Sequence, residues 1–330
     1  MVPVGVAMEA KKWSEDNYGK TLKKTSNLKS NACLAPSQPI PAFVLKALQK
    51  IHPEVTPKYY GCGLVVPECL EDCKLLDLGS GSGRDCYMLS QLVGEKGHVT
   101  GIDMTEDQVH NLLFRSWEHI CFSPDKRKVL SDAYRLLKDG GELYFSDVYS
   151  SRKLSDEIKN HKVLWECLGG ALWWGDQVRL AQEVGFSPPR LVTANVITVD
   201  NMELEAILGD YQFVSATYRL FKVPKISNKG SLVIYNGNIT GFGESLEFDA
   251  QYTFKVDEVV EVDGKVASIL SHSRFAEGFT FQPPGVPAGC GVKKPKVGTV
   301  NPFELVLQLG SATVSSATGG CCGAESSCCK

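Results

Sequence analysis

The chain has 330 residues, of which 43% are hydrophobic and 9% aromatic, so it is long enough for two domains and too apolar to be disordered throughout. Its formal net charge of −3 lacks the basic excess that nucleic acid or an anionic membrane surface would require. No apolar run approaches the roughly 20 residues that cross a bilayer. The first apolar residues precede Lys11 and Lys12, the reverse of the charge order of a secretory signal, and we expect a cytosolic protein.

The first predicted elements form the start of a doubly wound α/β sheet. Apolar residues between Ile40 and Ile51 follow one helical stripe, and residues 74–78 predict a short buried strand that runs into glycines. Residues 84–93 predict a helix, and residues 99–103 predict a second strand. The order of strand, glycine turn, helix and strand is typical of Rossmann-like sheets.

The next predicted elements continue this pattern. A helix is expected from Pro124 to Leu137. The pair Gly140-Gly141 stops it, and a strand follows over residues 142–148. Two more helices are expected over residues 155–168 and 176–184.

The pattern changes after Pro188-Pro189. Short strand-like runs follow, separated by Gly, Asn and Asp turns, at residues 191–199, 213–221, 232–235, 247–254 and 274–281. Beyond Pro283 the periodicity is lost. The predicted organisation is an N-terminal segment (1–35), an α/β domain (36–185), a smaller β-rich α+β domain (186–283) and a flexible tail (284–330) that carries Cys321, Cys322, Cys328 and Cys329.

The most informative motif lies between the first strand and the helix that follows it. Glycines at Gly79, Gly81 and Gly83 allow a sharp turn and bring the backbone close to a ligand at a helix N-terminus. Asp103, at the end of the next strand, is placed to accept hydrogen bonds from two ribose hydroxyls. Asp77, just before the glycines, would oppose a pyrophosphate but would attract the ammonium group of an amino acid.

This combination favours S-adenosylmethionine over a nicotinamide dinucleotide. A dinucleotide fingerprint requires glycine where this chain has Arg84. We therefore predict a methyltransferase, with a dehydrogenase on the same α/β scaffold as the alternative.

Longer stretches of the chain, from about residue 13 to 282, resemble the arsenite methyltransferases. The matching stretches are Tyr59-Tyr60-Gly61-Cys62-Gly63, LLDLGSGSGRDCYMLSQLVGEKGHVTGIDMT from Leu75, GGELYFSDVYS from Gly140, HKVLW and ECLGGAL around Trp165, and PPRLVTANVIT from Pro188. The resemblance implies a class I methyltransferase sheet. It also implies a cofactor site made of Tyr59, Asp77, Gly79, Gly81, Gly83, Asp103 and Met104.

The resemblance further implies that trivalent arsenic is held by cysteine thiolates and attacks the methyl group of the cofactor. Cys33 and Cys62 match family thiol positions and are the expected arsenic ligands. A thiophilic metalloid prefers thiolate ligands, and its own lone pair removes the need for a general base. The expected substrates are arsenite, methylarsonite and their glutathione adducts. Glutathione or thioredoxin is the expected reductant, and the protein is expected to be a monomer.

Two departures from the family pattern predict an incomplete sheet and weakened activity. Only 20 residues separate Asp103 from Pro124, whereas two helix–strand units would need roughly 45–60. In the family this interval contains the central strand and a cysteine that follows it. Tyr211 occupies the position of another family cysteine, and a phenol cannot replace a thiolate. A shortened gene product explains the gap, and the alternative function is a catalytically inactive protein that binds arsenic or soft metals through thiols.

Overall fold

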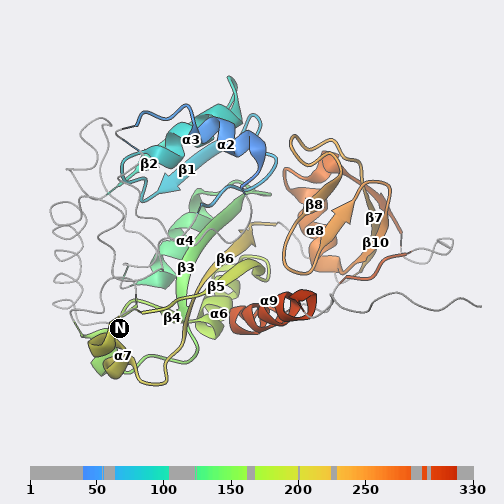
Figure 1. Cartoon of the computed structure of the whole chain (residues 1–330). Coiled ribbons are helices and arrows are strands. Elements are labelled where there is room, and N and C mark those ends of the chain that lie inside the picture. Colours follow the sequence, from blue (N-terminus) through green and yellow to red (C-terminus); the bar gives the residue numbers. More distant parts are fainter. Residues whose placement is uncertain are drawn as a thin grey trace, which may run out of the picture.

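The computed structural model of the chain (Figure 1) describes residues 40–53, 55, 64–103, 123, 125–161, 168–199, 201–223, 229–283, 292–295 and 299–317. These residues form an N-terminal α/β unit, a central sheet with helices packed on it, and a C-terminal α+β unit.

The N-terminal unit contains two parallel strands and two helices, namely α2 (Ala42–Leu48), β1 (Lys74–Leu78), α3 (Arg84–Val93) and β2 (His98–Ile102). The structure confirms the predicted bounds of the first strand and of the helix after it, and it places the second strand one residue earlier than predicted. Buried side chains of α2 and α3, including Val44, Met88 and Val93, form the core of the unit. The parallel register places Asp77 opposite Gly101, so the ends of both strands meet at the glycine turn.

The central sheet has four strands in the order β4-β3-β6-β5. The strands are β3 (Glu142–Ser150), β4 (Leu172–Trp173), β5 (Arg190–Val196) and β6 (Phe213–Phe221), and β6 runs antiparallel to both β3 and β5. The associated helices are α4 (Lys126–Leu136), α5 (Asp156–Lys159), α6 (Trp174–Val184) and α7 (Met202–Leu208). Every residue of β6 is buried, as expected for a strand covered on both faces.

The helices of the central unit pack in two separate apolar clusters. Leu130 of α4 and Ala181 of α6 pack with Tyr149 of the sheet. Ile158 of α5 and Leu204 of α7 pack in the other cluster, together with Val148, the residue of β3 just before Tyr149. Because Val148 and Tyr149 are consecutive residues of a strand, their side chains point to opposite faces, so helices cover both faces of the sheet.

The domain boundary predicted near residue 186 falls inside this sheet. The strands that the sequence pattern assigns to the C-terminal domain at residues 191–199 and 213–221 correspond to β5 and β6, and β6 pairs with β3 along its whole length. Strand patterns in a sequence show where a strand lies but do not identify its pairing partner. We therefore place the boundary after Phe221.

The C-terminal unit is built on a three-stranded sheet in the order β10-β7-β11, with a separate β8-β9 pair. Its elements are β7 (Ser231–Tyr235), β8 (Ser245–Glu247), β9 (Thr253–Lys255), β10 (Val259–Val262), α8 (Gly264–His272), the 3₁₀ helix η6 (Ala276–Gly278) and β11 (Phe279–Gln282). The strand predicted over residues 247–254 is wrong as a single strand. The Asp249 carboxylate accepts hydrogen bonds from the backbone N–H groups of Gln251 and Tyr252, and this turn separates β8 from β9.

A final helix, α9 (Pro302–Ala317), corrects the prediction of a flexible tail from residue 284. Figure 1 shows this helix beside α6 and the central sheet. Leu305 is buried in the cluster formed by α4 and α6, and the Tyr218 hydroxyl donates a hydrogen bond to the carbonyl of Val300 at 2.8 Å. These contacts attach the segment before and within α9 to the sheet.

The two parts of the α/β domain are not joined by strand pairing in the described residues. β1 pairs with β2, whereas β3 pairs with β4 and β6, and no described pairing connects β1 to β3. Leu76, in the middle of β1, is 43% exposed, although a central strand of a parallel sheet is normally buried on both faces. Because residues 104–122 lie outside the described residues, the incomplete sheet stays a prediction.

Candidate functional site

The turn between β1 and α3 has the backbone conformation that its glycines predict. Gly79, Gly81 and Gly83 all have positive φ angles, of 86°, 50° and 79°, which residues with a side chain rarely adopt. The N–H groups of Gly79 and Ser80 donate to the carbonyl of Ile102, at 2.7 and 3.0 Å. The turn is therefore fixed against the end of β2.

Asp103 is buried beside this turn. Its Oδ2 atom accepts a hydrogen bond from the N–H of Gly81 at 2.7 Å. The structure thus gives Asp103 a role in holding the glycine turn. Its predicted contact with ribose hydroxyls remains a prediction.

Asp77, at the end of β1, receives a hydrogen bond from the Cys86 thiol, with 3.2 Å between Sγ and Oδ2. Burial raises the pKa of the Asp77 carboxyl to about 6, against the lowering effect of the thiol, and the negative charges of Asp85 and Asp103 raise it further. A carboxylate in this environment is stabilised when a cation binds next to it.

Asp85 adds a third carboxyl to the same turn. Burial also raises its pKa, although Arg84, whose Nε donates to Asp85 Oδ1 at 2.8 Å, lowers it. Three carboxyl groups and one guanidinium therefore surround the start of α3. This charge balance disfavours a pyrophosphate and favours a ligand that carries positive charge.

Cys86 and Gly101 are site residues that the sequence analysis did not identify. A Cβ atom on Gly101 would lie 2.6 Å from the Cys86 Sγ and 2.9 Å from the side chain of Ser80. The thiol therefore fits against the backbone of β2 only because residue 101 is glycine. No local sequence signal shows this, because the contact joins α3 to the neighbouring strand.

The other predicted site residues, Cys33, Tyr59, Cys62 and Met104, lie outside the described residues. The structure does describe Tyr211, which the resemblance places at the position of a family cysteine. The Tyr211 hydroxyl donates to the carbonyl of Lys153 at 3.2 Å, and the guanidinium carbon of Arg152 lies 4.2 Å from the ring centroid. Tyr211 is also partly buried against the apolar cluster of α5 and α7, two residues before β6 begins.

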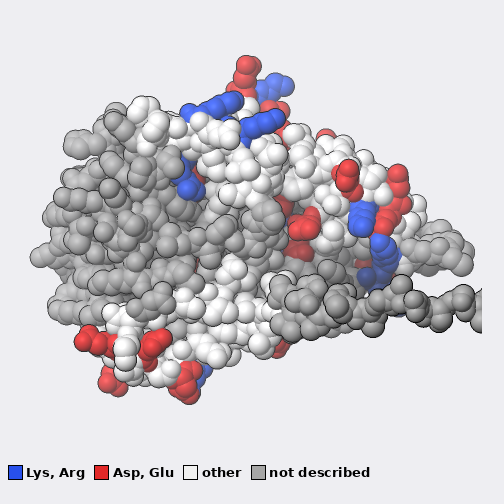
Figure 2. Space-filling view, in the orientation of Figure 1, with Lys and Arg blue, Asp and Glu red and all other residues white. Residues whose placement is uncertain are grey.

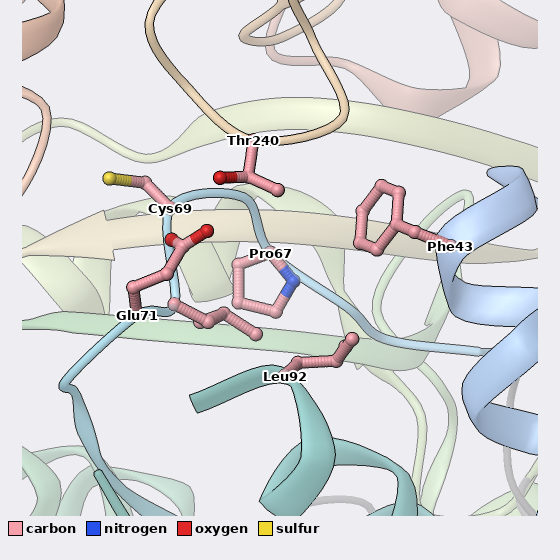
Figure 3. A pocket seen from close by; sticks show the side chains of 7 residues that line it. Phe43, Pro67, Cys69, Glu71, Leu92 and Thr240 are labelled. Carbon is pink, nitrogen blue, oxygen red and sulfur yellow. The ribbon is translucent and has the colours of Figure 1, made fainter. Parts of the chain in front are cut away.

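A described pocket lies away from the glycine turn. Figure 3 shows it between α2, the end of α3 and the loop that follows β7, and its lining residues include Phe43, Pro67, Cys69, Leu92 and Thr240. It contains none of the residues predicted to bind the cofactor. The described part of the chain also has no group of three or more His, Cys, Asp or Glu side chains able to hold a metal ion.

The described surface gives two further observations. On the face shown in Figure 2, basic and acidic side chains are interspersed, with acidic groups gathered over α7. Among the described helices, none has the length and apolar character needed to span a membrane.

Comparison with known protein families identifies methyltransferase relatives of this chain. A family model described as the arsenite methyltransferase C-terminal domain matches residues 228–329, and a methyltransferase domain model matches residues 70–120. The arsenite methyltransferase of Homo sapiens is 49% identical over an alignment of 368 residues, which covers 97% of this chain and 98% of the human protein. Because this alignment is longer than the chain itself, gaps must be opened in the chain, as expected for a missing internal segment.

More distant relatives give the same result. The arsenite methyltransferase of Aquipseudomonas alcaligenes is 43% identical over 81% of this chain and 89% of its own length. The crystal structure of CrArsM, an arsenic(III) S-adenosylmethionine methyltransferase from Chlamydomonas reinhardtii, superposes with a TM-score of 0.70 at 37% identity, over 75% of this chain and 98% of that one. With two relatives above 40% identity over most of the chain, a superposable crystal structure and the glycine turn in place, this chain belongs to the arsenite methyltransferase family.

Proposed function

We propose that the chain transfers a methyl group from S-adenosylmethionine to trivalent arsenic, as arsenite or methylarsonite, held by the thiolates of Cys33 and Cys62. The observation that carries this proposal is the acidic glycine turn. The described groups that shift the pKa of the buried Asp77 carboxyl include no cation. S-adenosylmethionine carries an ammonium and a sulfonium, so its charge matches the turn.

Each residue of the turn has its own role in binding the cofactor. Asp77 holds the ammonium group, and the backbone of Gly79, Gly81 and Gly83 leaves room for the ligand. Asp103 keeps the turn closed on β2 and, with Met104, faces the nucleoside. S-adenosylmethionine, when bound, supplies an electrophilic methyl group on a positively charged sulfur.

The acceptor side depends on thiol chemistry. Cys33 and Cys62 bind arsenic as thiolates and leave its lone pair available, so the lone pair forms the new As–C bond while the electrons of the S–CH3 bond remain with the departing sulfur. The protein's contribution is to align acceptor and donor and to exclude water. Arsenic is formally oxidised from +3 to +5, and glutathione or thioredoxin supplies the two electrons that return it to +3.

Two features reduce the expected activity relative to the family. Tyr211 offers no thiolate, and the strand pairing that would connect β1 to β3 is missing from the described residues. A glutathione adduct of arsenite would bring its own sulfur ligand and compensate in part for the lost cysteine. We further propose that the chain acts as a monomer in the cytosol.

The same two features favour a second candidate function, a protein that binds trivalent arsenic through Cys33 and Cys62 without methylating it. The two candidates differ in their need for the cofactor. A binding protein retains arsenite affinity when S-adenosylmethionine does not bind.

The test measures binding and transfer separately. Calorimetry gives the affinity for S-adenosylmethionine, and transfer of a labelled methyl group to arsenite, with glutathione present, gives the activity. We expect Asp77→Ala to remove cofactor binding and Cys62→Ser to remove transfer, while the control Cys73→Ser leaves both unchanged. Arsenite binding without cofactor binding would establish the second candidate, and loss of both would contradict each of them.

A further inference from the structure

A cluster of four charged residues, of which only Arg274 is partly exposed, joins the three units of the structure. We call Glu68, Glu142, Arg219 and Arg274 the charge cluster; they come from the segment before β1, from β3, from β6 and from the loop after α8, respectively. Two carboxyl groups face two guanidinium groups, so the cluster is formally neutral. Such a pairing allows charges to be buried at a tolerable cost in free energy.

Arg219 is the centre of the charge cluster, and its side chain is fully buried. Its Nε donates to Glu142 Oε1 at 2.5 Å, and its Nη2 donates to Glu142 Oε2 at 3.3 Å. Its Nη1 donates to the carbonyl of Phe248 at 2.8 Å and lies 3.1 Å from Glu68 Oε2. Every nitrogen of this guanidinium therefore has an oxygen partner.

Arg274 connects the C-terminal unit to the same carboxyl groups. Its Nη2 lies 2.5 Å from Glu142 Oε2, and its Nε donates to the backbone carbonyl of Glu68 at 2.8 Å. The Cys69 thiol in turn donates to the carbonyl of Arg274, at 3.4 Å. Burial acts to raise the pKa of Glu142, but Arg219 and Arg274 outweigh it and hold the pKa below its ordinary range.

Arg274 binds the segment of residues 64–73, whose backbone has two residues in an unfavourable conformation. Cys69 and Asp72 have positive φ angles, of 57° and 59°, a conformation that residues with a side chain rarely adopt. The C-terminal unit also contacts α2, because Phe43 packs edge-on against Phe242 at 5.9 Å. In Figure 3, Pro67 lies between Cys69 and Phe43 of α2, and Thr240 of the C-terminal unit lies above it.

The segment of residues 64–73 lies in the sequence between the proposed arsenic ligand and the proposed cofactor ligand. Cys62, the proposed arsenic ligand, precedes residue 64 by two positions, and Asp77, the proposed cofactor ligand, follows residue 73 by four. A shift of residues 64–73 would therefore change how the acceptor thiolate lies relative to the donor, and methyl transfer is sensitive to displacements of about 1 Å.

We propose that Arg274 is a positioning residue, by which the C-terminal unit fixes segment 64–73 and so sets the alignment of acceptor and donor. The proposal rests on the proposed function for its catalytic consequence. Its structural part, the fixing of the segment, is independent of activity. Arg274 acts here through Glu68 and Glu142 and touches neither substrate.

The test compares Arg274→Lys with Arg190→Lys. Arg190 of β5 is a matched control, because it forms another buried ion pair between the central sheet and the C-terminal unit, with Asp249 at 2.6 Å, and it has no described contact with residues 64–73. Lysine keeps the charge at both positions but cannot reach two oxygens in the planar geometry of arginine.

Hydrogen exchange of residues 64–73, followed by mass spectrometry, is the primary measurement. We expect Arg274→Lys to speed exchange in this segment about tenfold, while the strands of the C-terminal unit stay protected. Arg190→Lys should leave the segment unchanged. If Arg274→Lys lowers the melting temperature too far, Arg274→Gln, which keeps an amide donor but loses the ion pair with Glu142, should give the same local result.

Kinetics then tests the catalytic consequence. Arg274→Lys should lower kcat for methyl transfer severalfold while the dissociation constant for S-adenosylmethionine changes less than about twofold, because the glycine turn is unaltered. Equal exchange in the two variants, or an equal fall in cofactor affinity and kcat, would overturn the proposal. A wild-type chain without transfer activity would contradict the proposed function instead, and the exchange result would still decide whether Arg274 fixes the segment.

Discussion

The Cys86 thiol donates its hydrogen bond to the carboxyl of Asp77, and this contact stabilises the ionised form of the residue proposed to bind the ammonium group of the cofactor. The two residues face each other from the end of β1 and the first turn of α3. Sulfur is a weak donor, so the thiol offsets only part of the effect of burial on the Asp77 pKa.

Cofactor affinity should depend on pH through Asp77. The carboxyl has a pKa of about 6 and binds a cation only when it is ionised, so the affinity for S-adenosylmethionine should be constant above about pH 7 and fall about tenfold per unit below pH 6. Calorimetric titrations between pH 5 and pH 8 measure this profile. An affinity that is flat down to pH 5 would show that Asp77 does not bind the ammonium group.

Replacement of the thiol should move that profile. In Cys86→Ala the donor is lost, so the Asp77 pKa should rise and the fall in affinity should begin at higher pH. Cys86→Ser keeps a hydroxyl donor and is the matched control, with a profile close to that of the wild type. Identical profiles for the Ala and Ser variants would rule out a role for the hydrogen bond.

The raised pKa of Asp77 also predicts a gain in stability on removal of its charge. Because the folded pKa lies above the ordinary value of 3.8, the ionised form opposes folding, and this cost is present above about pH 6 and disappears below pH 4. Asp77→Asn should therefore raise the free energy of unfolding by at most about 3 kcal/mol at pH 7 and leave it unchanged at pH 3.5.

Urea denaturation of the cofactor-free protein checks this prediction. The exposed Asp132, whose ion pair with Lys128 lies on the surface of α4, gives a control, since Asp132→Asn should not stabilise the protein at pH 7. The same Asp77→Asn variant should bind S-adenosylmethionine poorly, so stability and binding should change in opposite directions. A variant less stable than the wild type at pH 7 would refute the prediction.

The local elements of the cofactor turn could be predicted from sequence, whereas its tertiary contacts could not. The run from Lys74 to Leu78 followed by three glycines defines the strand and the turn by local patterning alone. The contact of Cys86 with Asp77 and Gly101 depends on how α3 lies over β1 and β2. Spacing along the chain does not encode that geometry.

The difference between local patterns and tertiary contacts also explains the two main errors in the predicted fold. The pairing of β6 with β3 joins residues about 70 positions apart, so strand patterns near residue 186 suggested a new domain. The helix α9 escaped prediction because its Ser, Thr and Gly residues weaken the helical pattern, while its attachment depends on Leu305 reaching the cluster below the central sheet. In both cases a long-range contact outweighs the local signal.

Gly101 should be intolerant of a side chain. In Gly101→Ala the new methyl group would lie 2.6 Å from the Cys86 Sγ, and such overpacking should lower the free energy of unfolding by roughly 1–3 kcal/mol. The double variant Gly101→Ala/Cys86→Ala removes the sulfur and should recover part of this loss, because the contact with Ser80 remains. Additive effects of the two changes would show that the thiol does not lie against Gly101.

Tyr211 offers a gain-of-function test of the acceptor site. By the resemblance it occupies the position of a family cysteine. It also packs, partly buried, against the apolar cluster of α5 and α7, so its replacement should cost roughly 0.5–3 kcal/mol of stability. If this position lies near the thiolates of Cys33 and Cys62, Tyr211→Cys adds a third sulfur ligand. Arsenite should then bind about tenfold more tightly or better, since a further ligand on the same ion binds intramolecularly.

The matched control for this change is Tyr211→Ser, which loses the same ring contacts but gains no thiolate. Arsenite affinity is measured by equilibrium dialysis for the wild type and both variants, with the cysteines kept reduced. A tighter complex in Tyr211→Cys alone would place residue 211 at the arsenic site, and methyl transfer should rise in the same variant because a third thiolate holds the lone pair toward the donor. Equal affinities in the Cys and Ser variants would mean that β6 begins too far from the other thiolates, and the loss of the cysteine would then not explain a weakened activity.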